Sequence, residues 1–159
     1  DLWIGAVERL QQAGLKDIRI IHRGFCTVDS SPYRNAPLWE LAERFHTHFP
    51  ELPFYCDPSH IGGKRELLAA ICKKAISLHA DGLFIESHCC PQKALSDAAQ
   101  QLTPPALAEL LAMLNVLVGC RCLLASRLLI SVFFFDLCPL PCFFLPFRDF
   151  LTLFFFFFF

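Results

Sequence analysis

The amino-acid sequence predicts an α/β fold in residues 1–115, built from about three βα units of a (β/α)8 barrel. Short apolar runs alternate with amphipathic helical segments, and this alternation is typical of parallel sheets. The expected strands end near Arg23, Asp57 and Glu86, so they recur at roughly the 30-residue length of a βαβ unit. Ionisable side chains follow each of these strand ends, as they do around the rim of barrel enzymes.

The first elements are expected within residues 2–48. Residues 2–13 have apolar side chains at i, i+4 and i+7, which predicts an amphipathic helix, and Gly14 follows as its cap. The β-branched run at 18–21 predicts the first strand. Residues 27–37 are polar and form a loop that is long enough to carry function. Residues 38–48 again show helical periodicity.

The later elements repeat this order. Residues 52–56 and 82–86 predict the second and third strands, and residues 65–79 predict the long helix between them. A short helical stretch is expected around Ala94. The last helix is expected at 105–117, because proline is tolerated in a first helical turn. The predicted order is therefore α-β-α-β-α-β-α.

A doubly wound nucleotide-binding sheet would also fit this alternation. Such a sheet requires a glycine-rich turn after its first strand, with the pattern G-x-G-x-x-G. The pair Gly62-Gly63 does not match this pattern and follows a histidine instead. The barrel is therefore the preferred prediction.

The overall composition excludes some classes of protein. The formal net charge of -1 argues against binding of nucleic acid through a basic surface. Nine Cys at irregular spacing do not form the even set of a secreted disulfide framework, and five of them lie within the α/β part. Free thiols suit a reducing compartment, so a cytoplasmic location is expected.

Residues 116–159 differ in composition from the rest of the chain. Residues 133–159 alone hold 13 of the 18 Phe, and the chain ends in a run of Phe. Out-of-frame translation of T-rich DNA would give such a run, so a low-complexity, non-native tail is expected at 116–159. A membrane anchor is the alternative, although prolines interrupt a segment that would need about 20 apolar residues to span a bilayer.

Three side chains near the expected rim are candidate metal ligands. An imidazole, His60, and two carboxylates, Glu86 and Asp97, suit a divalent transition metal ion. Each residue also has a structural alternative. His60 could be a hydrogen-bonded structural histidine, Glu86 a salt-bridge partner, and Asp97 a helix cap.

Basic side chains near the same rim are candidate phosphate ligands. Arg23 stands at a strand end, Gly24 leaves room for an anion beside the backbone, and a guanidinium suits bidentate phosphate contacts. The alternative for Arg23 is an ion pair with a neighbouring carboxylate. Lys64 and Arg65 follow the glycine pair and could extend a phosphate site, or they could simply begin a solvated helix.

At these positions the sequence resembles a known family. The stretch C-D-P-S-H-I-G-G-K-R at 56–65, G-L-F-I-E-S-H at 82–88 and A-L-S-D at 94–97 are similar to 3-deoxy-D-arabino-heptulosonate 7-phosphate (DAHP) synthases. The segments H-R-G-F at 22–25 and Y-R-N at 33–35 fit the same family. The resemblance covers about residues 1–115 and is closest to the bacterial type that is often fused to chorismate mutase.

The resemblance implies that residues 1–115 are the C-terminal part of a (β/α)8 barrel. That barrel condenses phosphoenolpyruvate with erythrose 4-phosphate in the first step of the shikimate pathway. His60, Glu86 and Asp97 would be three of four ligands to Mn2+, Fe2+, Co2+ or Zn2+, and the fourth ligand, a Cys, is expected upstream of residue 1. Arg23 and Arg65 would bind substrate, while His60 and Asp57 would be catalytic, with Asp57 orienting water or a ligand.

Further expectations follow from the same resemblance. The full-length enzyme would be a homo-oligomer, and the fragment alone is expected to be inactive. The sister enzyme, 3-deoxy-octulosonate 8-phosphate synthase, is the second candidate, because its usual motif differs from D-P-S-H. A non-catalytic, membrane-associated polypeptide is the third.

Overall fold

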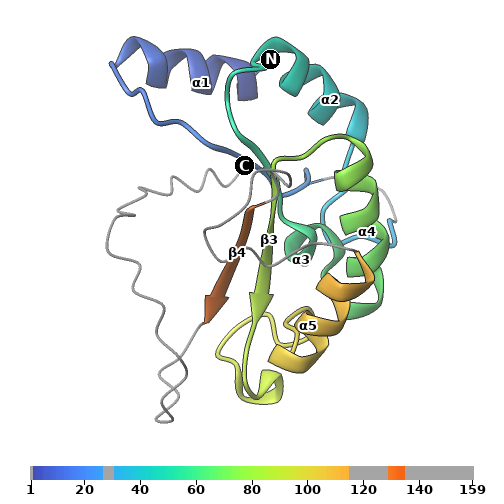
Figure 1. Ribbon diagram of the computed structural model, residues 1–159. Helices are drawn as coiled ribbons and strands as arrows, with labels where there is room; N and C mark the ends of the chain where they lie inside the picture. Colours follow the sequence, from blue (N-terminus) through green and yellow to red (C-terminus); the bar gives the residue numbers. More distant parts are fainter. Residues whose placement is uncertain (1, 27–30, 115–128, 135–159) are drawn as a thin grey trace.

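The computed structural model describes residues 2–26, 31–114 and 129–134. Helices alternate with strands through this part of the chain, as predicted (Figure 1). The elements in chain order are α1 (Leu2–Gln12), β1 (Ile20–His22), α2 (Trp39–His48), β2 (Phe54–Cys56), α3 (Pro58–Gly62), α4 (Arg65–Ser77), β3 (Gly82–Ser87), the 3-10 helix η1 (Pro91–Lys93), α5 (Pro104–Met113) and β4 (Leu129–Phe134).

The strands form one parallel sheet in the order β1-β2-β3-β4. His22 in β1 pairs with Cys56 in β2, and Cys56 in turn pairs with Leu83 in β3. Because every pair is parallel, the carboxyl ends of the strands lie at one edge of the sheet. Side chains that follow β1, β2 and β3 are therefore brought to a common edge.

The strand β4 lies within the segment that was expected to be a tail. It pairs with β3 over six residues, from Gly82 opposite Leu129 to Ser87 opposite Phe134. This strand was not among those predicted, because the Phe-rich composition around it obscured a six-residue, mostly apolar run of ordinary strand length. The rest of the expected tail, 116–128 and 135–159, lies outside the described residues, so the interpretation of 116–159 stays a prediction.

Two short helices follow strands β2 and β3. The segment after β2 is the five-residue helix α3, which was not among the predicted elements. Asp57 caps it, Pro58 occupies its first turn, and Gly63 closes it at a positive φ of 64°. The short helical stretch expected around Ala94 is the 3-10 helix η1, which ends at Lys93, directly before the extended backbone of Ala94. A five-residue helix is too short to show periodicity, and Pro91 begins only a single turn.

The core lies between the sheet and its helices. All six residues of β3 are buried, as expected for a central parallel strand. In Figure 1, α4 and α5 lie on the side of β3 opposite to β4. The largest fully buried apolar side chains come from α3, α4 and β3, and they are Ile61, Leu68, Ile71, Leu83 and Ile85. Within the described ranges, no helix combines the length and the apolar character needed to cross a bilayer.

Candidate metal centre

His60 is held in a defined orientation by Asp57. The Asp57 carboxylate accepts a hydrogen bond from the backbone N–H of His60 at 3.1 Å, and its other oxygen lies 2.7 Å from His60 Nδ1. Both side chains are buried, with Asp57 0% and His60 5% exposed. Because a carboxylate only accepts hydrogen bonds, Nδ1 carries the proton and the lone pair of Nε2 is available to a metal ion.

Glu86 lies opposite His60 on β3. Its backbone N–H donates to the Ser59 hydroxyl at 3.0 Å, so α3 is fastened to β3 next to the ligand. Its carbonyl accepts from the N–H of Leu102 at 3.1 Å. The residue is 6% exposed, and Glu86 Oε1 lies 3.4 Å from His60 Nε2. Each residue of the D-P-S-H motif thus has its own role. Asp57 caps α3 and Pro58 begins it, Ser59 accepts a hydrogen bond from the backbone of Glu86, and His60 is a candidate ligand.

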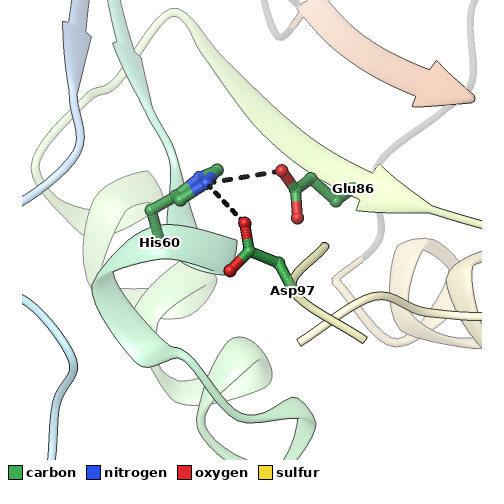
Figure 2. A group of neighbouring side chains, drawn as sticks. All are labelled: His60, Glu86 and Asp97. Carbon is green, nitrogen blue, oxygen red and sulfur yellow. Dashed lines mark ion pairs between the residues drawn. The ribbon is translucent and has the colours of Figure 1, made fainter. Parts of the chain in front are cut away.

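Asp97 approaches from the loop between η1 and α5. Its backbone has a positive φ of 54°, and its Oδ2 lies 3.8 Å from His60 Nε2. One ligand atom from each of His60, Glu86 and Asp97 lies within 4.8 Å of the others (Figure 2). Asp97 does not begin a helix, so its alternative role as a cap does not apply. The three predicted ligands do come together.

This donor set fits a divalent cation. It offers one imidazole nitrogen and two carboxylate oxygens, a combination that suits Zn2+, Mn2+, Fe2+ or Co2+. Two carboxylates facing one small space repel each other, and a cation between them relieves that repulsion. The residues present therefore fit the kind of ion that the sequence predicted.

Two residues that were not among the predicted site residues contact the ligands directly. Gln100 Nε2 donates to Glu86 Oε2 at 2.8 Å, and Arg34 Nη1 donates to Asp97 Oδ1 at 2.5 Å and to Gln100 Oε1 at 3.0 Å. Arg34 stands in the Y-R-N motif, whose presence was noted without a role for its arginine. No spacing signal pointed to Gln100.

Arg23 lies at the carboxyl end of β1, as predicted. Its carbonyl accepts from Asn35 Nδ2 at 3.3 Å, and the residue is half-buried. A Cβ on Gly24 would meet Asn35 Cβ at 2.7 Å, so Asn35 fills the space that was predicted to receive an anion beside Gly24. The glycine is required there by this close approach and by its φ of 81°. The role of Arg23 in phosphate binding stays a prediction.

Arg65 begins α4 and holds the loop that carries Asp97. Its Nε donates to the carbonyl of Gln101 at 2.6 Å, and its Nη2 donates to the carbonyl of Ala98 at 2.5 Å. Gln101 Nε2 also donates to the carbonyl of Ser96 at 3.0 Å, which closes the loop on itself. The guanidinium thus contacts two backbone oxygens of the candidate ligand loop, both of them after Asp97 in the chain.

We expect the variant Arg65→Met to weaken Mn2+ binding by about tenfold, because residues that orient metal ligands are typically worth 10- to 100-fold in affinity. Isothermal titration of the full chain with Mn2+ measures this. Lys64→Met is the matched control, since Lys64 is an exposed cation one position earlier. If both variants keep wild-type Mn2+ affinity but Arg65→Met alone binds inorganic phosphate more weakly, then Arg65 serves the substrate and not the loop.

The buried thiols near this edge are not competing ligands. Burial raises the pKa of Cys72 to about 12 and that of Cys56 well above its usual range. Both thiols therefore stay protonated near neutral pH, and a protonated thiol is a poor metal ligand. The candidate centre depends on nitrogen and oxygen donors.

Comparison with known proteins shows which family the chain resembles. The model of the DAHP synthetase I family matches residues 1–118. A phospho-2-dehydro-3-deoxyheptonate aldolase of Thermotoga maritima is 41% identical over 98 residues, which are 61% of this chain and 28% of that protein. A 2-dehydro-3-deoxyphosphooctonate aldolase of Desulfotalea psychrophila is 29% identical over 113 residues, which are 67% of this chain and 40% of that protein.

Solved structures agree with this assignment. The crystal structure of the Thermotoga maritima DAHP synthase superposes with a TM-score of 0.63 at 31% identity, covering 70% of this chain and 32% of that one. The chain thus spans less than half the length of these relatives. Because the family model matches well over half of its residues, the chain belongs to the DAHP synthetase I family.

Proposed function

We propose that this chain forms the C-terminal, metal-binding part of a (β/α)8 barrel that condenses phosphoenolpyruvate with erythrose 4-phosphate to give DAHP and phosphate. The observation that carries the proposal is the meeting of His60, Glu86 and Asp97 within 4.8 Å at the carboxyl edge of a parallel sheet. Barrel enzymes place their active sites at this edge. The family match and the name of the Thermotoga relative support the same reaction.

The three candidate ligands have distinct tasks in this proposal. His60 Nε2, Glu86 Oε1 and Asp97 Oδ2 would hold the divalent ion, which when bound acts as a Lewis acid toward the aldehyde oxygen of erythrose 4-phosphate. Asp57 fixes the ring of His60 through the contact at Nδ1, so that Nε2 is the nitrogen that faces the ion. Asp57 is buried, so this orienting role does not depend on solvent.

The substrate's phosphate requires a separate cation. Arg23 leads out of β1 toward the same edge, and its planar guanidinium can contact two oxygens of the phosphoenolpyruvate phosphate. In the reaction, the double bond of phosphoenolpyruvate supplies the electron pair for a bond from carbon 3 to the aldehyde carbon. Water adds to carbon 2, the aldehyde oxygen takes up the proton that the water releases and becomes a hydroxyl, and the C–O bond to phosphate breaks. Inorganic phosphate leaves with the electron pair of that bond.

The sister reaction differs only in the length of the aldehyde. A heptonate product contains three carbons from phosphoenolpyruvate and four from a tetrose, whereas an octonate product requires a pentose. The chain is 41% identical to the heptonate enzyme of Thermotoga maritima and 29% identical to the octonate enzyme of Desulfotalea psychrophila. The tetrose phosphate is therefore the preferred substrate in this proposal.

A chimera tests the proposed reaction. Residues 1–118 replace the aligned segment of the Thermotoga DAHP synthase, and phosphoenolpyruvate consumption is followed with Mn2+ and either sugar phosphate. We expect turnover with erythrose 4-phosphate at least about tenfold faster than with a pentose phosphate, because a substrate that leaves a polar site unmatched loses transition-state binding. We also expect EDTA to abolish turnover and added Mn2+ to restore it.

Two results would contradict the proposal. A chimera that is folded by circular dichroism but inactive with both sugars would exclude this reaction for the residues tested. A preference for the pentose phosphate would instead assign the sister reaction.

A further inference from the structure

A continuous chain of hydrogen bonds runs behind the candidate ligands. It leads from Glu86 Oε2 to the amide of Gln100, from that amide to Arg34 Nη1, and from Arg34 Nη1 to Asp97 Oδ1. We infer that Gln100 and Arg34 are positioning residues that aim Glu86 and Asp97 at one metal ion. This inference rests on the proposed metal centre and assigns two residues that act through its ligands.

The division of ligand atoms supports this role. His60 Nε2, Glu86 Oε1 and Asp97 Oδ2 face one another, at 3.4 Å and 3.8 Å from the imidazole nitrogen. The remaining polar atom of each side chain is bound elsewhere in the protein. Those partners are Asp57 for His60 Nδ1, Gln100 for Glu86 Oε2 and Arg34 for Asp97 Oδ1. Each candidate ligand thus directs one polar atom toward the other two ligands, while a neighbouring residue holds its second polar atom.

The amide of Gln100 is chemically matched to its two partners. A carboxylate such as Glu86 accepts only, and a guanidinium such as that of Arg34 donates only. A neutral amide can donate to the first and accept from the second, so its orientation is determined by its neighbours. Gln100 is 1% exposed, and a buried amide without partners would be costly. A glutamate here would face the Glu86 carboxylate with a second negative charge.

The backbone around Arg34 is arranged for close approach to the His60 helix. A Cβ on Gly63, which closes α3, would meet Arg34 Cβ at 2.7 Å. The next residue, Asn35, donates from Nδ2 to the carbonyl of His60 at 3.1 Å and from its backbone N–H to the carbonyl of Ile61 at 3.2 Å. The segment that carries Arg34 is therefore fastened to the segment that carries His60.

The test is a double-mutant cycle on Mn2+ affinity, measured by isothermal titration on the full chain. We expect Gln100→Met and Arg34→Met each to weaken Mn2+ binding by about 10- to 100-fold, as is typical for partners of metal ligands. Because both residues act in one chain, the double variant should be about as weak as the weaker single variant, not weaker by the product of both effects. Gln92→Met and Arg44→Met are matched controls at exposed positions and should bind as the wild type does.

A spectroscopic measurement separates positioning from general loosening of the fold. The visible absorption of bound Co2+ reports ligand geometry, so Gln100→Met should change the band shape at saturating Co2+, while Gln92→Met should not. Arg34 is partly exposed, so Arg34→Met offers a second route if Gln100→Met does not fold.

The outcomes are distinguishable. Wild-type chain that is folded by circular dichroism yet binds neither Mn2+ nor Co2+ would overturn the proposed centre, and this inference with it. Wild-type binding together with unchanged affinity and spectra in both Gln100→Met and Arg34→Met would overturn only the inference. Multiplying effects in the double variant would also contradict it, because they would mean that the two residues act separately.

Discussion

Replacing His60 by alanine should weaken Mn2+ binding by more than about 100-fold, because even an outer partner of a metal ligand is worth 10- to 100-fold. His60 supplies the only nitrogen in the candidate donor set, and its Nε2 is closest to the two facing carboxylate oxygens. Isothermal titration of the full chain with Mn2+ measures the loss. In the active chimera, turnover at a fixed low Mn2+ concentration should fall in parallel.

This variant also perturbs the protein without metal. The imidazole lies between Asp57 on one side and Glu86 and Asp97 on the other, so its removal leaves the buried Asp57 carboxylate without the ring nitrogen that it contacts. Glu86→Gln separates binding from folding, since it removes a ligand charge without removing volume. We expect Glu86→Gln to weaken Mn2+ binding strongly while leaving the unfolding midpoint of the metal-free chain unchanged or raised.

His48→Ala provides the matched control, because His48 is an exposed histidine at the end of α2. Its Mn2+ affinity should equal that of the wild type. Equal losses in His48→Ala and His60→Ala would point to binding by histidines in general. Unchanged Mn2+ affinity in both His60→Ala and Glu86→Gln would contradict the proposed centre, because the metal ion would then not bind to these residues.

The candidate ligands could be predicted from the sequence because strand ends carry positional information. Parallel strands separated by helices must end at one edge, so residues that directly follow them share that edge. His60 and Glu86 satisfy this rule, since they follow or end β2 and β3. Asp97 is farther from its strand; it was predicted from its place near the same rim, and the family motif implies the same role.

The positioning residues could not be found in this way. Arg34 and Gln100 belong to loops, and loop paths are set by side-chain contacts that no periodicity records. Gln100 lies in a loop that Arg65 and Gln101 hold through its carbonyls, and these contacts are not visible in the sequence pattern. Gly24 was wrongly associated with an anion for the same reason, since only the course of the loop shows that Asn35 occupies that space.

The stability of the fold should depend on pH through a second buried histidine, His22. It ends β1 with its ring turned into an aromatic cluster, where its centroid lies 5.2 Å from that of Trp39 and 5.7 Å from that of Phe25. The side chain is 1% exposed, and its Nε2 has no hydrogen-bond partner within the described part of the chain. Burial lowers the pKa of His22 to about 4, although a hydrogen bond to the backbone of Pro37 partly opposes this.

The direction of the resulting pH dependence follows from linkage. Between about pH 4 and pH 6.5, the unfolded chain binds a proton at His22 that the folded chain does not. The free energy of unfolding therefore falls as pH decreases through this window, and the contribution of neutral His22 is complete above pH 6.5. Two pKa values that differ by about 2.5, at about 1.4 kcal/mol for each pH unit, correspond to a loss of about 3 kcal/mol.

His22→Phe should remove this loss, because phenylalanine fits an aromatic cluster and cannot be protonated. Denaturant unfolding of the full chain at pH 7 and pH 4, with EDTA present, measures the free energy of unfolding for both proteins. We expect the wild type to lose about 3 kcal/mol more than His22→Phe between these two pH values. His48→Phe, at an exposed position, should lose as much as the wild type. Equal losses in wild type and His22→Phe would show that His22 is accessible to protons in the folded chain, and the aromatic cluster would then have to open at little cost.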